Sequence, residues 1–364
     1  MGKSILIDYK TNNLNFIRLF AAFQVLIDHL ISHLFSAPES VKYVHMFNGV
    51  PIFFTISGYL IFWSYDNNPK LKNYFFNRFL RIYPALFCSF IITVFLLLIF
   101  QTIDLNDVKS SSFIFWILSQ LTFIQQFTPS VVHGFGGFGN PNPPLWTISV
   151  EILLYCSIPF LYGLINKYSK KAKTLIIIVL AAISYIENST DIMHSYLESL
   201  SSNGYYKIFL IPFFQFISFF FFFAFGILFY LHKEKLTRRV INKVHILLPV
   251  YILFSVILVQ INYYPGNYHP NILELFNHLL LVFCIFSVAY TKSGLTSRVL
   301  GKTDISYGLY IYHFLVINVF RELGLFSEWW FIPCMALCFF VGHLSWILVE
   351  KPVLKLKKIS LHKI

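Results

Sequence analysis

Long apolar runs are the feature that most constrains how this chain folds. Ten of them recur along its 364 residues, and several are short enough to need flanking residues to cross a bilayer: 14–35, 47–63, 85–101, 145–165, 174–187, 207–231, 246–261, 272–291, 305–321 and 330–349. Hydrophobic residues make up 57% of the chain and charged residues 12%, whereas soluble proteins average about 45–50% and about 25%. We therefore predict an all-α polytopic membrane protein, a single domain over residues 1–364 with about ten transmembrane helices in one bundle.

The lysines and arginines predict how the chain is threaded, because cytoplasmic loops carry an excess of both. Ten spans with both termini in the cytoplasm place all but four of the 28 basic residues on the inner side. Counting the short run 113–123 as an eleventh span would send the lysine-rich loop 167–173 outside. We therefore expect 102–144 to be an external excursion, within which 113–123 is interfacial or re-entrant. Residues 1–13 are polar and no cleavage site follows, which indicates an uncleaved first span.

Two compositional features argue against other functions. The net charge of +12 is explained by basic loops facing anionic lipid headgroups, so nucleic acid need not be invoked, although a polyanionic cytosolic ligand is compatible with it. The five cysteines lie in apolar runs without CxxC pairing, which predicts reduced, packed thiols and neither disulfides nor a metal site.

The first run contains Arg18 and His29, which are eleven positions apart. At 100° per residue both lie on one stripe of a helix, about 16 Å apart along its axis. A donor with an anionic head and a thin arm that ends in a reactive group matches that spacing, and coenzyme A thioesters have this shape. The alternative is that Arg18 extends to the headgroups while His29 pairs with Asp28 or with another helix.

Three other segments carry polar groups into or beside the membrane. Arg78 and Arg81 share one helical face at the cytosolic boundary and form either a phosphate clamp or an ordinary positive-inside anchor. Glu151 lies about two turns into the fourth span, where an unpaired carboxylate is costly, so we expect it to face a cavity.

In the ninth run, Ser306, Tyr310 and His313 follow the i, i+4, i+7 spacing of one helical face. They form either a hydrogen-bonding wall or the polar contacts that hold a bundle together.

Taken in order, these segments resemble the acyltransferase-3 family of membrane acyltransferases, which includes O-antigen and exopolysaccharide O-acetyltransferases. The similarity rests on an arginine and histidine in the first span, "PIFFTISGYLIF" (51–62) with Ser57, "RFLRIYPAL" (78–86), "LWTISVE" (145–151) and "SYGLYIYH" (306–313). Asn15 and Phe16 depart from the Asp and Gly that family members often have before the arginine. We expect no SGNH-type domain after the last span.

The resemblance implies a multi-pass protein of a prokaryotic inner membrane that takes acetyl-CoA from the cytosol as co-substrate, with no permanently bound cofactor. The implied acceptor is a carbohydrate hydroxyl, free or lipid-linked, such as one of lipopolysaccharide O-antigen. It also implies that His29 is essential and that the arginines serve the donor.

The resulting hypothesis assigns a role to each residue. Arg18, Arg78 and Arg81 bind the CoA phosphates, and His29 acts as general base on the sugar hydroxyl or forms a covalent acetyl-histidine. Glu151 orients His29 or the acceptor. The groups that stabilise the oxyanion or position the sugar are Ser57, Tyr310 and His313. A transporter or flippase of glycolipid or acyl substrates, a non-catalytic scaffold and an unrelated membrane O-acyltransferase architecture are the alternatives.

Overall fold

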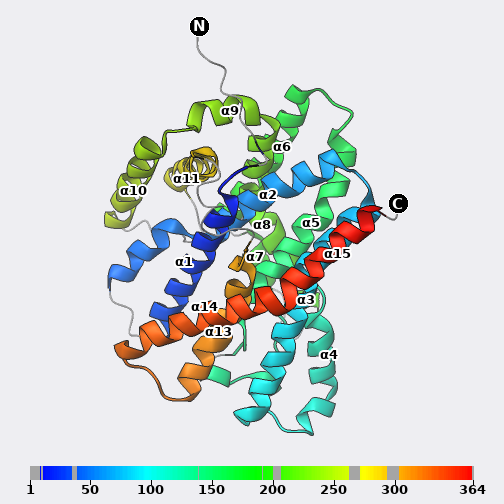
Figure 1. Ribbon diagram of the computed structural model, residues 1–364, viewed down its shortest axis with the longest axis vertical. Helices are drawn as coiled ribbons and strands as arrows, with labels where there is room; N and C mark the ends of the chain where they lie inside the picture. The colour runs from blue at the N-terminus through cyan, green and yellow to red at the C-terminus, as the bar shows by residue number, and fades with distance from the viewer. Residues whose placement is uncertain are drawn as a thin grey trace.

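The computed structural model describes residue 9 and residues 11–34, 39–137, 139–190, 192–199, 206–261, 271–292 and 303–362. Within these ranges the regular structure is entirely helical (Figure 1). The main helices are α1 (Leu14–Leu34), α2 (Gly49–Asn67), α3 (Leu71–Ile99), α4 (Ser111–Gln120), α5 (Trp146–Ile165), α6 (Lys170–Thr190), α7 (Ile192–Ser199), α8 (Tyr206–Leu231), α9 (Lys233–Val240), α10 (Val244–Gln260), α11 (Ile272–Tyr290), α13 (Ser306–Glu322), α14 (Phe331–Ser345) and α15 (Lys351–His362).

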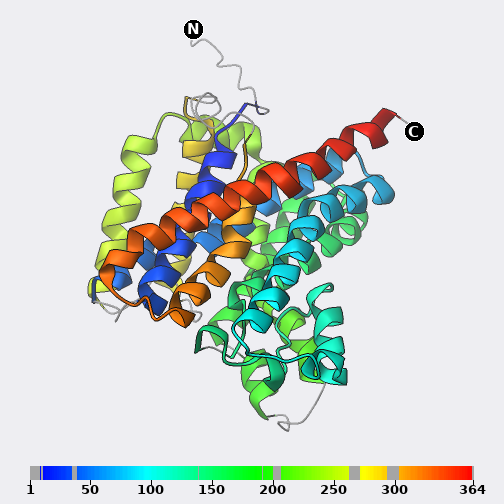
Figure 2. The ribbon, with the colours of Figure 1, turned by 60° about the horizontal axis from the view of Figure 1, so that its bottom comes forward.

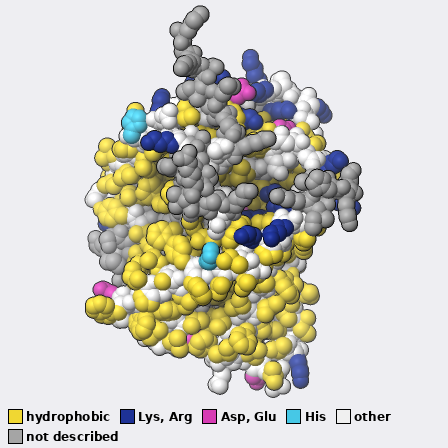
Figure 3. All heavy atoms as spheres, viewed as in Figure 1, with side chains coloured by type: hydrophobic (Ala, Val, Ile, Leu, Met, Phe, Trp, Pro, Cys, Tyr) yellow, Lys and Arg dark blue, Asp and Glu magenta, His cyan; other side chains and the backbone are white. Residues whose placement is uncertain are grey.

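Each of the ten apolar runs contains or overlaps one long helix, as predicted. Eight stretches of the described chain are long and apolar enough to cross a membrane, and a ninth is added if α9 and α10, which meet at 85°, count as one span. The chain is therefore an all-α polytopic membrane protein. Its apolar exterior fits that environment: hydrophobic side chains cover most of the lower part of the face in Figure 3, whereas lysines and arginines gather toward the end that carries α9.

Two elements differ in extent from the apolar runs that predicted them. The helix expected at 85–101 begins at Leu71, so it includes both arginines of the "RFLRIYPAL" segment. The run 113–123 forms α4, which has ten residues and thus rises only about 15 Å, half of what a bilayer core requires. Its predicted position outside the membrane remains a prediction.

The innermost helix is α13, in which nearly every side chain from Ser306 to Phe320 is buried. It packs against α1, α14 and α3, and two tyrosines fix it to α3: Tyr307 and Tyr312 donate their hydroxyl hydrogens to the carbonyls of Ile82 (2.9 Å) and Ala85 (3.2 Å). Because α13 is enclosed on all sides, its polar residues face protein and not lipid.

Close helix packing explains one glycine of the "PIFFTISGYLIF" segment. A Cβ added to Gly58 in α2 would lie 2.0 Å from the carbonyl oxygen of Phe223 in α8, and one added to Gly226 would lie 2.1 Å from that of Thr55. Small residues let membrane helices approach this closely. The glycine in this motif therefore serves the contact between α2 and α8.

One element continues α14 into α15 through a single π-helical turn, Trp346–Glu350. The resulting long element crosses the front of the molecule in Figures 1 and 2, and α15 packs against α3. Such π-turns often occur at functional sites, and this one ends on the buried carboxylate of Glu350.

Candidate active site

The helices α1 and α13 run side by side in the same direction and carry both ends of the site. Arg18 near the start of α1 contacts Asp304, which lies two residues before the first residue of α13, and His29 further along α1 contacts His313 in α13. Both residue numbers rise together, so the two helices are parallel. Since α1 is continuous from Leu14 to Leu34, the predicted stripe of Arg18 and His29 exists and each of its residues faces a polar partner in α13 or just before it.

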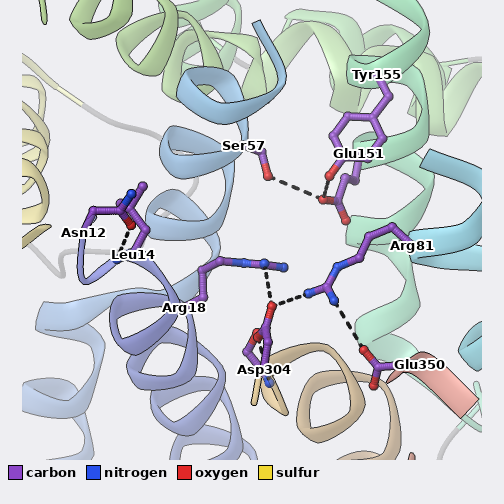
Figure 4. A network of polar contacts seen from close by, with 10 residues as sticks. Asn12, Leu14, Arg18, Ser57, Arg81, Glu151, Tyr155, Asp304 and Glu350 are labelled. Carbon is purple, nitrogen blue, oxygen red and sulfur yellow. Dashed lines mark hydrogen bonds and ion pairs between the residues drawn. The ribbon is translucent and has the colours of Figure 1, made fainter. Parts of the chain in front are cut away.

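A network of ion pairs occupies the end of this stripe that holds Arg18 (Figure 4). One carboxylate oxygen of Asp304 accepts from both Arg18 (2.9 Å) and Arg81 (2.7 Å), and Arg81 also reaches Glu350 at 3.5 Å. All four side chains are largely buried, with Glu350 only 3% exposed. Two arginines and two carboxylates thus neutralise each other, and the network joins α1, α3 and the π-turn to the start of α13.

Asp304 is the centre of this network. Its second oxygen accepts from the Ser306 hydroxyl (2.5 Å) and backbone N–H (3.4 Å), the arrangement of a helix cap. Burial alone would raise the pKa of Asp304, but the guanidinium groups of Arg18 and Arg81 together outweigh it and hold this pKa well below its usual range. Asp304 is therefore ionised and tethers both arginines.

Arg78 differs from the other two arginines. Its guanidinium lies over the rings of Tyr74 (5.9 Å) and Tyr155 (5.6 Å), and its buried Nε has no hydrogen-bond partner. No carboxylate within the described ranges forms a salt bridge with it. Lys357 in α15 lies close enough to interact electrostatically with Arg78 and Arg81. The positive charge that this end leaves without a carboxylate partner in the described chain therefore belongs to Arg78.

A second polar cluster surrounds Glu151 in α5 (Figure 4). Its Oε1 accepts hydrogen bonds from the hydroxyl of Tyr155 and from that of Ser57 in α2, the latter at 3.4 Å. Glu151 therefore belongs with Ser57, as two residues of the same site, and the side chain that hydrogen-bonds to His29 is His313.

A small cavity connects these clusters. It has a volume of about 30 Å³ and is lined by Arg18, Val50, Phe53, Phe54, Thr147, Ile148, Glu151, Tyr307 and Tyr310. Tyr310 shares a hydrogen bond of 2.7 Å with Thr147 and donates to the carbonyl of Pro144. The cavity lies beside Arg18, and its lining includes Tyr310, which lies one turn before His313 in α13. In volume it matches roughly one water molecule, about 30 Å³ in the liquid.

The histidine end has a defined hydrogen-bond order. His313 Nδ1 lies 2.6 Å from the carbonyl oxygen of Tyr310, and His313 Nε2 lies 2.7 Å from His29 Nδ1. A carbonyl only accepts, so His313 Nδ1 carries a hydrogen and, in the neutral ring, Nε2 accepts. His29 then donates from Nδ1, and its Nε2 keeps a lone pair. No partner of that nitrogen is found among the described residues.

A loop covers α13 beyond the histidines. The backbone N–H of Gly136 donates to Glu322 (2.6 Å), and Arg321 donates to the carbonyls of Gly136 and of His33. Gly136 has φ = +68° and a Cβ there would lie 2.3 Å from Asn318, so this position requires glycine. Arg321 thus binds the excursion to the ends of α1 and α13.

Sequence reasoning missed three partners of these residues: Asp304, Glu350 and Tyr155. Asp304 precedes an apolar run at the position of a helix cap, and Glu350 is a carboxylate at the end of one. Both are costly unless paired, which was the available signal. Their partners are 223 to 286 positions away in the chain, so the pairing itself was not visible.

The fold and the site together define a class: a polytopic membrane protein with paired ionisable residues enclosed in its helix bundle. Within this class the chain belongs to the acyltransferase-3 family, whose model, described as an acyltransferase domain, matches residues 11–349. No solved structure matches the chain.

Three relatives illustrate the family. The chain is 28% identical to nodulation protein 10 of Rhizobium leguminosarum bv. viciae, over 95% of this chain and 94% of that protein. It is 29% identical to the O-acetyl transferase of Shigella phage Sf6, over 94% of this chain and 96% of that protein. The peptidoglycan O-acetyltransferase OatA of Listeria monocytogenes is 26% identical over 85% of this chain but only 51% of its own length.

Proposed function

We propose that the protein is an O-acyltransferase that moves an acetyl group from cytosolic acetyl-CoA to a hydroxyl of a cell-surface carbohydrate, such as O-antigen or exopolysaccharide. The observation that carries this proposal is the order along α1 and α13: a cationic end, a cavity, and a histidine with a free lone pair. The O-acetyl transferases among its relatives support the reaction. We place the cationic end toward the cytosol of a prokaryotic inner membrane, following the distribution of lysines and arginines.

In this proposal the donor binds at the end that holds the arginines. Arg78 supplies the charge that the CoA phosphates meet, since Arg18 and Arg81 already share Asp304. Arg18 and Arg81, which Asp304 and Glu350 neutralise, frame the entrance. The pantetheine arm then follows the cavity toward His29. Because that cavity holds about 30 Å³, the side chains around it, Phe53 among them, must move aside when the donor enters.

His29 performs the proton transfer. Its Nε2 takes the proton of the acceptor hydroxyl while that oxygen attacks the thioester carbonyl carbon. The carbon–sulfur bond then breaks, and the CoA thiolate receives the proton back from His29. His313 accepts from His29 Nδ1 throughout, so it is a positioning residue that keeps the lone pair on the reacting nitrogen.

A covalent route uses the same groups. His29 Nε2 attacks the thioester carbonyl carbon, the carbon–sulfur bond breaks and CoA leaves as its thiolate. The sugar hydroxyl then attacks the acetyl carbon, the carbon–nitrogen bond to the imidazole breaks, and the proton of the hydroxyl passes through His29 Nε2 to the thiolate. Mass spectrometry of the His29 peptide after incubation with acetyl-CoA without acceptor separates the routes, because only the covalent one leaves an acetyl group on that ring.

The remaining predicted residues line or border the cavity. Glu151, held by Ser57 and Tyr155, offers a carboxylate oxygen to an acceptor hydroxyl. The Tyr310 hydroxyl is positioned by Thr147 and Pro144 and donates toward the developing oxyanion when the donor displaces one of these contacts.

Acetyl transfer from radiolabelled acetyl-CoA to surface polysaccharide tests the proposal, in membranes that contain equal amounts of each variant. We expect His29→Ala to lose the about 10²–10⁴-fold that a general base contributes. His343→Ala is the matched control, because His343 lies in α14 with its side chain exposed. Undiminished transfer by His29→Ala would exclude His29 as base or nucleophile and leave the scaffold and flippase alternatives.

A further inference from the structure

A second cavity lies outside the proposed reaction path, at the end of the bundle where α2 ends and α6 and α9 begin. Its volume is about 270 Å³, and its lining residues are Asp66, Lys170, Lys173, Tyr230, Leu231, Lys233 and Glu234. Since α2 ends at Asn67 and α3 begins at Leu71, this lysine cavity opens at the same end of the bundle as Arg78. It is separate from the cavity that Arg18 lines.

The lysines of this cavity have no carboxylate partner. None of the three forms a salt bridge within the described chain, and Lys173 donates instead to the side-chain oxygen of Asn166 (3.2 Å). The lining has two carboxylates: Asp66, which accepts from the hydroxyl of Tyr230 at 2.6 Å, and Glu234 in the first turn of α9. Three lysines and two carboxylates leave the cavity with one net positive charge.

Aromatic rings hold the third lysine in place. The Lys233 ammonium lies 4.6 Å from the ring centre of Tyr230, 5.1 Å from that of Trp63 and 5.5 Å from that of Tyr9. Cation–π contacts fix the ammonium without neutralising it. A fixed, uncompensated charge is what an anion site needs.

The start of α6 adds to this field. Lys170 and Lys173, which line the cavity, lie at its N-terminus, where the first turn has no acidic residue. A helix N-terminus carries a partial positive charge and favours anions, so this placement is unfavourable unless an anion binds there. The positive-inside rule explains the number of lysines on this side. It does not explain why lysines from two helix starts converge on one cavity.

We propose that the lysine cavity binds the phosphate group of a phosphate ester. Two sources carry this chemistry at a cytosolic surface: the 3′-phosphate of the CoA nucleotide and the headgroup of an anionic phospholipid. The first source rests on the proposed function, because it makes the cavity a nucleotide subsite of the donor. The second does not depend on it.

Binding and stability measurements on the purified full-length chain in lipid nanodiscs distinguish the sources. The nucleotide arm compares the affinities of CoA and dephospho-CoA, which differ by the 3′-phosphate. The lipid arm compares the melting temperature in discs of phosphatidylglycerol and of phosphatidylcholine. The test variant is Lys170→Gln/Lys173→Gln. The matched control, Lys167→Gln/Lys171→Gln, removes the same charge from exposed lysines that do not line the cavity.

In one of the two arms, the wild type and the control should either bind CoA more tightly than dephospho-CoA or melt at a higher temperature in phosphatidylglycerol than in phosphatidylcholine. The test variant should lose that difference. A charge-assisted contact of about 1.5–3 kcal/mol predicts a preference of about 10- to 150-fold for CoA in the nucleotide arm. A Lys170→Arg/Lys173→Arg variant should restore the difference, which separates lost charge from lost folding. A test variant that behaves as the wild type in both arms overturns the proposal.

The experiment also separates this proposal from the proposed function. Neither arm requires acetyl transfer, so His29→Ala should leave both unchanged. If CoA fails to bind the wild type at all, acyl-CoA as donor is refuted while the lipid arm still tests the lysine cavity. If CoA binds the wild type and the lysine variant equally, and the lipids do not distinguish them either, only the lysine cavity is refuted.

Discussion

Replacing His313 with leucine should slow acetyl transfer without weakening donor binding. In the structure the His313 ring accepts from His29 Nδ1 over 2.7 Å and is itself fixed by the Tyr310 carbonyl at 2.6 Å. Leucine leaves the Nδ1 hydrogen of His29 without a partner in a buried site, which costs about 1–3 kcal/mol. His29 avoids that cost by moving the hydrogen to Nε2, the nitrogen that must accept a proton.

The size of the effect follows from this cost. About 1–3 kcal/mol corresponds to about 5- to 150-fold in the population of the productive tautomer, and kcat should fall by that factor while KM for acetyl-CoA stays the same. His313→Gln is the informative companion, because its side-chain carbonyl oxygen can reach the position of the ring Nε2 and accept from His29. We expect it to retain more activity than the leucine variant.

The assay is initial acetyl transfer at saturating acetyl-CoA, with a double variant to test the coupling. If His313 acts through His29, then His29→Ala/His313→Leu should be no slower than His29→Ala alone, because groups that act as a unit are not additive. If the effects of the two substitutions on the rate were fully additive, or if His313→Leu were as fast as the wild type, His313 would not act through His29. A raised KM with unchanged kcat would assign His313 to substrate binding instead.

Three further results are expected. Arg78→Gln should raise KM for acetyl-CoA by about 10- to 150-fold, the value of one charge-assisted contact, and leave the melting temperature unchanged. Arg81→Gln should instead lower the melting temperature, because it leaves the charge of Asp304 less compensated. Equal effects of the two substitutions would contradict this division of roles. Asp304→Asn should destabilise the fold by up to about 3–5 kcal/mol. Because the pKa of Asp304 is depressed in the folded protein, its ionised form stabilises the fold at every pH above its unfolded pKa of about 3.9, and this stability is lost only as the pH falls toward the folded pKa. The wild type and Asp304→Asn should therefore differ in melting temperature by the same amount at pH 5 and at pH 8. Gly58→Val should abolish accumulation in the membrane, because its Cβ would lie 2.0 Å from Phe223; normal levels on a fluorescence-detected gel filtration would show that α2 and α8 separate easily.

The fold class could be predicted from the sequence because each membrane-spanning helix must be apolar along its own length, and this shows in a short stretch of residues. Ten apolar runs correspond to helices, and the stripe of Arg18 and His29 follows from helix geometry alone. The ends of the helices were predicted less well. The helix α3 begins at Leu71 and not at 85, because its first turns contain charged residues, and an apolar run leaves these out.

The pairing of the site residues was beyond the sequence. Arg18 was expected to bind the CoA phosphates, and in the structure it pairs with Asp304. His313 was expected to stabilise the oxyanion or position the sugar, and in the structure it contacts His29. These contacts join residues more than 280 positions apart, and nothing local distinguishes a polar group that meets a ligand from one that meets another helix. The structure separates the two by their partners: within the described ranges no carboxylate pairs with Arg78, whereas Arg81 pairs with two.

Because α1 and α13 are parallel and are in contact at both Arg18 and His29, the distance between these two residues is fixed. Eleven residues of helix set about 16 Å between them on α1, and their contacts with Asp304 and His313 hold both positions. In the proposed function the CoA phosphates bind at Arg78, beside the Arg18 end of this spacing, and the thioester carbonyl lies at His29. A donor arm much shorter or longer than the spacing would then fail to bring its carbonyl to the histidine. Inserting one alanine between Arg18 and His29 would shift His29 relative to Arg18 by about 1.5 Å along the helix axis and rotate it by about 100°. The contacts of Arg18 with Asp304 and of His29 with His313 could then no longer form together.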